Sequence, residues 1–220
     1  MKTSKNPDFR LAMEKANEIL VSSKVIDFFP FAVNKLIKDQ ANITCRTFAK
    51  AVEKYNVPME EFGSESAIIT KKLGRSMILY CCDKPKTHIR FSILHEFGHA
   101  VLGHPLAFED GERYGTKEVE TNFFTAQILM PEQLLIELQC RGVRITNEFL
   151  VKTFGVSKKA AEKRLNTLRQ IDWDRRNRTE RNYDDAILLK YKDFLNSIQP
   201  KKFDSFEDEY EMENERNSWQ

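Results

Sequence analysis

The sequence has no hydrophobic run long enough to cross a bilayer, which requires about 20 consecutive apolar residues. Its first 20 residues are charged throughout and lack the apolar stretch of a secretory signal peptide. The sequence also lacks a large excess of either charge. It has 35 lysines and arginines and 33 aspartates and glutamates, for a formal net charge of +2. So small an excess gives no argument for nucleic-acid binding. We therefore expect a cytoplasmic protein without membrane contact.

Paired cysteines are missing as well. The four cysteines form no C-x-x-C pair, and two of them are adjacent, which suits a disulfide framework poorly; they are Cys45, Cys81, Cys82 and Cys140. We expect reduced thiols, as in other cytosolic proteins. The 220 residues are 41% hydrophobic and 31% charged, an ordinary globular composition. This length suffices for one large domain or for a domain with an appendage.

Apolar spacing and helix-ending residues predict a mainly helical chain. Residues 9–20 carry apolar side chains at helical spacing. Pro30 suits the first turn of a second helix, and Thr116 suits the N-cap of a later one. The segment after residue 146 is expected to form two helices that break at Gly155, with Ser157 capping the second. Further helices are expected over residues 45–57, 91–103 and 131–140.

Two short strands are expected in the middle of the chain. Residues 66–72 and 76–82 are separated by a turn at Gly74. A single buried helix is the alternative, but the isoleucine and tyrosine content and the glycine favour strands. From Ile171 onward the chain is strongly charged, and its acidic end, FDSFEDEYEMENERNSWQ, is expected to be disordered.

Three of the four histidines lie within ten residues of an otherwise apolar segment, FSILHEFGHAVLGH. His95, Glu96 and His99 form the pattern H-E-x-x-H. Residues four apart lie on one face of a helix, so both imidazoles can reach one zinc ion at about 2.0–2.1 Å. Glu96 is rotated by about a third of a turn from His95, which places its carboxylate beside the ion as a general base. The pattern therefore predicts a zinc peptidase.

The alternative is a core helix that carries polar residues without a ligand. In that case each buried and unpaired polar group would cost about 1–3 kcal/mol. A metal removes this cost for the histidines, and we favour the metal site for that reason.

A third protein ligand is expected, because two histidines alone would hold zinc weakly. The candidates are His104, Glu109, Asp110, Glu112, Glu118 and Glu120. His104 lies five residues after His99, whereas the metzincin pattern requires six. The loop acids are more simply solvated. Glu118 is favoured over Glu120, because it lies one turn into the expected helix, with Asn122 four residues later to orient a ligand histidine.

Three segments resemble the ImmA/IrrE-type metallo-endopeptidases, a gluzincin-like family. RFSILHEFGHAVLGHP is similar to the active-site helix of that family, EVETNFFTAQILMP to its second helix, and FLVKTFGVSKKAAEKRLNTL to the helical pair that follows. The resemblance covers residues 68–168. Thr121 and Thr125 depart from the family's usual alanines, and Gln127 is a further departure.

The resemblance implies an α+β, mostly helical fold. A zincin-like catalytic domain, with a small β-sheet packed on the active-site helix, is followed by a helical pair of helix-turn-helix type. We divide the chain into an N-terminal helical segment of the catalytic domain, the metallopeptidase core, the helical pair, and a charged, partly disordered extension. The corresponding ranges are 1–60, 61–140, 141–170 and 171–220.

The resemblance also implies roles for individual residues. His95, His99 and Glu118 are the expected Zn²⁺ ligands, Glu96 the general base, and Asn122 the residue that orients a ligand. The implied activity is site-specific cleavage of an intracellular regulatory protein, such as a helix-turn-helix repressor of a phage or mobile element. Manganese or iron could occupy the same ligands.

Two other functions remain open on the sequence. A DNA-binding regulator with a metal site is suggested by basic residues that could contact phosphates, namely Lys158, Lys159, Lys163, Arg164, Arg175, Arg176, Arg178 and Arg181. The apolar residues of the same segment, however, are explained by packing alone. A purely structural zinc is disfavoured, because such a site has no use for the carboxylate of Glu96.

Overall fold

The computed structural model describes six parts of the chain, residues 6–41, 43–56, 64–72, 75–105, 112–171 and 175–200. Its helices are α1 Phe9–Ser22, α2 Val33–Ala41, α3 Phe48–Tyr55, α4 Lys86–Val101, α5 Glu112–Leu129, α6 Glu132–Cys140, α7 Asn147–Phe154, α8 Lys158–Leu168, α9 Arg178–Lys190 and α10 Lys192–Ile198. Its strands are β1 Thr44–Thr47, β2 Ala67–Lys72 and β3 Arg75–Tyr80. The expected α+β, mostly helical fold with a small sheet is confirmed.

The sheet has the order β1-β3-β2, with β1 parallel and β2 antiparallel to β3. The two predicted strands are therefore present, with Ile69 opposite Ile78, while Gly74 lies outside the described residues. The prediction of one helix over residues 45–57 was wrong at its start, because β1 pairs with β3 there. Thr47 ends the strand, and its side chain accepts a hydrogen bond from the backbone N–H of Lys50, which caps α3.

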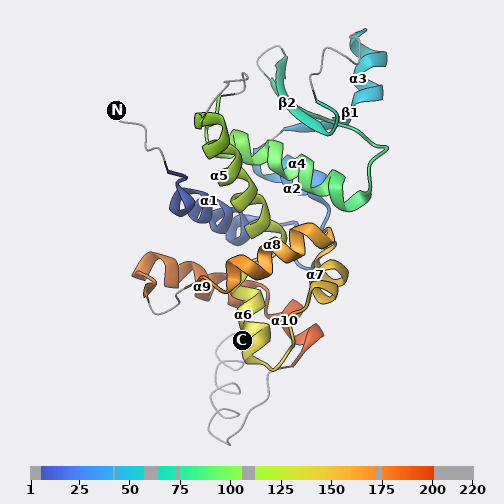
Figure 1. Ribbon diagram of the computed structural model, residues 1–220. Helices are drawn as coiled ribbons and strands as arrows, with labels where there is room; N and C mark the ends of the chain where they lie inside the picture. The colour runs from blue at the N-terminus through green and yellow to red at the C-terminus, as the bar shows by residue number, and fades with distance from the viewer. Residues whose placement is uncertain are drawn as a thin grey trace, which may run out of the picture.

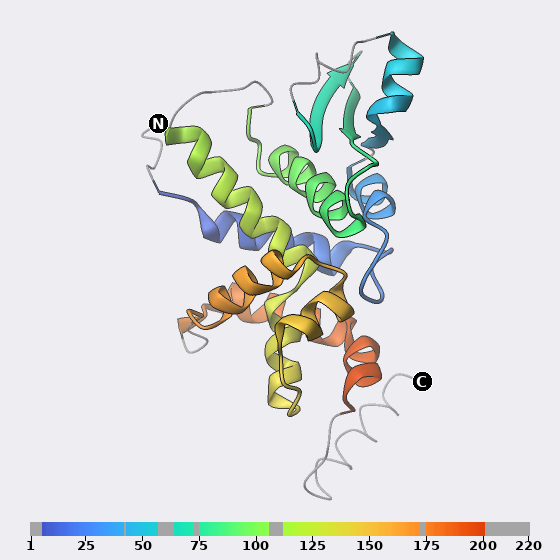
Figure 2. The same cartoon turned by 45° about the vertical axis from the view of Figure 1, so that its right-hand side comes forward.

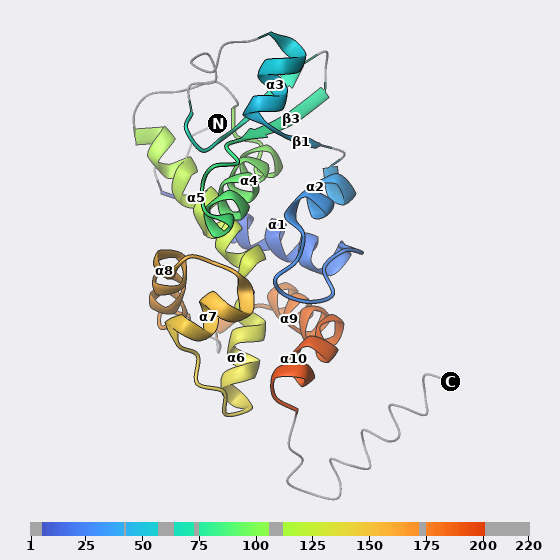
Figure 3. The same ribbon diagram turned by 90° about the vertical axis from the view of Figure 1, so that its right-hand side faces the viewer.

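The sheet and α3 lie at one end of the molecule, and α6 to α10 lie at the other (Figures 1 and 3). Helices α1, α4 and α5 fill the space between them (Figure 2). A single hydrophobic cluster extends through the molecule from Ala12 to Leu195. A smaller cluster of Phe48, Ala51 and Leu79 packs α3 on the sheet. Among the described helices, none combines the length and apolar character that a bilayer span requires.

Several predicted helix boundaries shift in the structure. Pro30 follows a cis peptide bond and precedes α2, so it does not lie in the first turn of that helix. Thr116 lies inside α5, which begins four residues earlier, at Glu112. The predicted break at Gly155 is confirmed, with a left-handed φ of 63°, and Ser157 caps α8 as expected.

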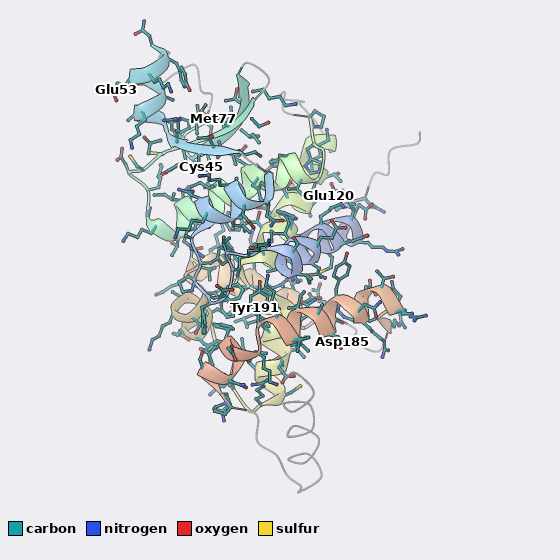
Figure 4. All side chains as sticks on the ribbon, turned by 180° about the vertical axis from the view of Figure 1, so that it is seen from behind. Cys45, Glu53, Met77, Glu120, Asp185 and Tyr191 are labelled. Atoms are coloured by element: carbon teal, nitrogen blue, oxygen red, sulfur yellow. The ribbon has the colours of Figure 1, made fainter. Side chains whose placement is uncertain are left out.

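Helices α9 and α10 were not predicted, because charged residues obscured their apolar face. Ile187, Tyr191 and Leu195 recur at helical spacing and are buried in the main cluster. The hydroxyl of Tyr191 donates a hydrogen bond to the carbonyl of Leu20 at 2.9 Å (Figure 4). The expected disorder of the acidic end falls outside the described residues.

A buried polar network joins the C-terminal helices to α5. The Arg164 side chain is 1% exposed and donates hydrogen bonds to the carbonyl of Met130, at 2.9 Å, and to Gln127. The Gln127 amide in turn donates to Asn17 at 2.8 Å and to Gln133 at 2.9 Å. The departure of Gln127 from the family pattern is thereby explained, since it binds groups from α1, α6 and α8.

Helices α4 and α5 approach each other closely at Gly98. A Cβ atom at this position would lie 2.8 Å from both Phe124 Cδ1 and Thr121 Cγ2. The rings of Phe97 and Phe124 meet beside this contact with centroids 6.2 Å apart. Glycine is therefore required at position 98 by the spacing of the two helices.

We expect Gly98→Ala to lower the free energy of unfolding by about 1–3 kcal/mol, because the added methyl overpacks the contact between the helices. Gly115→Ala is the matched control, since a Cβ atom there meets no described atom within 4 Å. That variant should be neutral or more stable by up to about 1 kcal/mol. Denaturant titration measures both, and equal stability of the two variants would contradict the close approach.

Candidate metal centre

The H-E-x-x-H residues lie on α4, and α5 presents Glu118 to them. His95 Nε2 and His99 Nε2 are 3.0 Å apart. One oxygen of Glu118 lies 3.1 Å from His95 Nε2, and the other lies 3.0 Å from His99 Nε2. The structure thus brings together the three side chains that were expected to bind the metal, one from each of two successive turns of α4 and one from the facing helix.

The geometry of these three donors fits a small divalent cation. Tetrahedral bonds of about 2.0–2.1 Å place neighbouring ligand atoms about 3.3 Å apart, close to the 3.0–3.1 Å separations found here. One ligand atom each from His95, His99 and Glu118 lies within 4.8 Å of the others. No second group of this kind occurs among the described histidines, cysteines and acids. Two imidazoles and one carboxylate are a catalytic zinc donor set, although other transition metals accept it too.

The surroundings keep Glu118 ionised. Hydrogen bonds from His95, and then from His99, hold the pKa of Glu118 well below its usual range, and its burial opposes this only in part. The carboxylate therefore carries the negative charge that a cation requires.

Glu96 lies beside the three donors and is held by the sheet. Its Oε2 accepts a hydrogen bond of 2.9 Å from the backbone N–H of Ile69 on β2. Burial raises the pKa of Glu96, while the neighbouring His95 and the Ile69 N–H oppose that rise. A partly buried carboxylate with a raised pKa is a stronger base than an exposed one, which suits the role expected of Glu96.

Glu120 and His104, both weighed as third ligands, lie outside the three-donor group and form a pair. His104 Nε2 is 3.0 Å from Glu120 Oε2, and His104 Nδ1 is 3.0 Å from His99 Nδ1. Burial, the largest cause, lowers the pKa of His104, and its hydrogen bond with Glu120 opposes this shift. Thr121 Oγ1 lies 3.5 Å from His99 Nδ1. These contacts relate two helices, so spacing along the chain gave no sign of them.

The prediction that Asn122 orients a ligand histidine is corrected. Asn122 is exposed, and His99 Nδ1 contacts His104 and Thr121 instead. The Nδ1 atom of His95 is buried and has no partner among the described residues. The expectation that the departure of Thr121 from the usual alanine does not touch the ligands was wrong, because its hydroxyl lies beside His99. Glu109 and Asp110 lie outside the described residues, as does the side chain of Glu112.

Comparison with known proteins gives one family match. The model of the family described as Peptidase_M78, IrrE N-terminal-like domain, matches residues 37–166. Comparison with curated proteins finds no match. Among solved structures, a Mycobacterium tuberculosis transcriptional regulator is similar at 14% sequence identity with a TM-score of 0.47. The similarity covers 80% of this chain and 51% of that protein, so the chain spans about half its length.

We expect the purified chain to bind one zinc ion, and Glu118→Gln to weaken that binding. Loss of an outer partner of a ligand costs about 10–100-fold in affinity, so loss of the ligand's charge should cost at least tenfold. Competition against a chromogenic chelator measures the Kd. Glu53→Gln on α3, far from the centre (Figure 4), is the control and should leave the Kd unchanged. Equal affinity of Glu118→Gln and wild type would remove Glu118 from the ligand set.

Proposed function

The chain belongs to the family of the IrrE N-terminal-like domain, Peptidase_M78, and from this premise we propose that it is a zinc-dependent endopeptidase. The observation that carries the proposal is the Glu96 carboxylate beside a centre to which the described part of the chain contributes three protein donors. Structural zinc sites close with four protein ligands, whereas catalytic sites keep one position open. A base next to an open position is the arrangement that hydrolysis requires.

The residues of the centre would have different roles in peptide hydrolysis. His95, His99 and Glu118 would hold the ion, and a bound divalent metal supplies Lewis acidity toward water and toward the scissile carbonyl. Because Oε2 of Glu96 is engaged by Ile69, we assign Oε1 to the proton of the attacking water. Glu96 holds that proton while the water oxygen bonds to the carbonyl carbon, and it delivers the proton to the amine nitrogen as the C–N bond breaks.

The proposed substrate is an intracellular regulatory protein, such as a helix-turn-helix repressor of a phage or mobile element. The resemblance to ImmA/IrrE-type enzymes supports this substrate class, while the geometry of the centre supports only peptide hydrolysis. Zinc is the proposed metal because two imidazoles and one carboxylate suit it.

We expect Glu96→Gln to keep zinc and to lose cleavage. The amide is nearly isosteric and leaves the three ligands in place, but it cannot accept the proton, which should cost about 10²–10⁴-fold in rate. Zinc content and cleavage are measured on the same preparation. Full activity in Glu96→Gln would exclude the base role.

The substrate is sought by comparing the proteomes of cells that express wild type, Glu96→Gln or the control Glu53→Gln. A regulatory protein cut in wild type and in Glu53→Gln, but intact in Glu96→Gln, is the expected result. Fragments that appear equally in all three would contradict the proposed activity.

Two of the basic residues that suggested the alternative function, DNA binding, are held in contacts within the protein. Arg164 is buried and bonded to Met130 and Gln127. Arg176 forms ion pairs with Glu132 and with Asp184, the latter at 2.7 Å. The exposed lysines of α8, which are Lys158, Lys159 and Lys163, remain available to phosphates.

We expect no salt-dependent binding of the chain to random duplex DNA, because Arg164 and Arg176, two of the basic residues that suggested it, are held in contacts within the protein. Fluorescence anisotropy between about 50 and 200 mM salt is the measurement, since phosphate contacts lose affinity steeply over that range. Binding that weakens with salt, and that is abolished by replacing the three lysines of α8 with alanine, would favour the regulator instead.

A further inference from the structure

A line of hydrogen-bonding groups runs from His99 to the beginning of α1. His99 Nδ1 lies 3.0 Å from His104 Nδ1, and His104 Nε2 lies 3.0 Å from Glu120 Oε2. The other oxygen of Glu120 accepts a hydrogen bond of 2.6 Å from the backbone N–H of Asp8. The side chains of His104 and Glu120 are 8% and 15% exposed. The His104 and Glu120 side chains are therefore largely buried, on the opposite side of His99 from Glu118, whereas Asp8 is exposed.

One arrangement of protons connects these groups when a metal is bound. His99 Nε2, which faces the donor group, then carries no proton, so the His99 proton lies on Nδ1 and is donated to His104 Nδ1. The His104 proton lies on Nε2 and is donated to the carboxylate of Glu120. Thr121 donates its hydroxyl proton to the carbonyl of Lys117 at 2.8 Å, and its oxygen lies 3.2 Å from His104 Nδ1 and 3.5 Å from His99 Nδ1.

We propose that His104 and Glu120 are positioning residues that hold the His99 ring with Nε2 directed at the metal. A ligand histidine commonly donates its other ring N–H directly to a carboxylate, which fixes its tautomer and orientation. Here a second imidazole stands between the ligand and the carboxylate. The inference rests on the proposed metal centre, but it does not depend on peptidase activity.

We call the line of hydrogen bonds from His99 through His104 and Glu120 to Asp8 the relay. Two features distinguish the relay from ordinary packing. In this arrangement His104 accepts a hydrogen bond at Nδ1 and donates one at Nε2, which an apolar side chain filling the same space could not do. The relay also spans three elements, with His104 just beyond the end of α4, Glu120 on α5 and Asp8 at the N-cap of α1. Metal binding and the seating of α1 should therefore be coupled through Glu120.

The test measures the zinc Kd of folded variants without substrate. His104→Leu removes the acceptor for His99 and should raise the Kd about 10–100-fold. His104→Gln keeps an acceptor and a donor, so its Kd should rise by less than about tenfold. His88→Leu is the matched control, because His88 lies on the same helix and its described side-chain hydrogen bond joins it to the half-buried Ser66, outside the three-donor group, so its Kd should not change.

A double variant tests whether Glu120 acts through His104. Glu120→Gln alone should raise the Kd, but it should add nothing in the His104→Leu background, because the connection is already broken. Thermal unfolding of the metal-free variants verifies their fold, and if His104→Leu does not fold, Glu120→Gln carries the test.

Distinct outcomes overturn the relay and the metal centre. A His104→Leu or Glu120→Gln variant with the wild-type Kd overturns the relay. The same conclusion follows if His104→Gln is as weak as His104→Leu, since volume alone would then explain the loss. A wild-type chain that binds no zinc at all overturns the proposed centre itself.

Discussion

The close contact between α4 and α5 is the constraint on which the centre depends. With no side chain at Gly98, the helices approach until Phe124 and Thr121 touch the backbone of α4. At that distance the short carboxylate of Glu118 reaches the Nε2 atoms of both ligand histidines. A wider spacing would leave the two imidazoles without a third donor, since the ligand set is divided between two helices.

The sheet holds Glu96, the remaining residue of the site, through a backbone hydrogen bond. Helix α4 carries these residues on two of its faces. Its histidines contact α5, and Glu96 contacts β2. The antiparallel register, in which Ile69 lies opposite Ile78, leaves the Ile69 N–H free to bond Glu96 instead of β3. The histidines and the base therefore share α4 but have different partners, α5 for the histidines and β2 for Glu96.

Local geometry explains which parts of the site could be predicted. The positions of His95, Glu96 and His99 follow from helical spacing alone, which is why the sequence sufficed for them. Glu118 was preferred on spacing and on resemblance, whereas its contact with α4 depends on the tertiary packing at Gly98. The pair of His104 and Glu120 is separated by 16 residues and arises only when α5 packs back on α4.

Elsewhere in the fold, features that depend on a short segment were likewise predicted, whereas features that depend on distant contacts were missed. The end of α7 at Gly155, the N-cap of α8 at Ser157 and the hairpin strands depend on short segments, and they were predicted from the sequence. Strand β1 was missed because it is only four residues long and its pairing partner lies some 30 residues away along the chain. Helices α9 and α10 were missed because their buried stripe is narrow and charged residues surround it.

Helix α5 finally connects the metal centre to the C-terminal helices. Its first half carries Glu118 and Glu120, and its second half carries Gln127, which binds Arg164 of α8. Arg164 is buried, and a hydrogen bond to a charged group contributes about 1.5–3 kcal/mol. The orientation of α8 is thus fixed against the helix that supplies a metal ligand. Arg164, one of the basic residues that suggested DNA binding, instead holds α8 against the helix that carries Glu118.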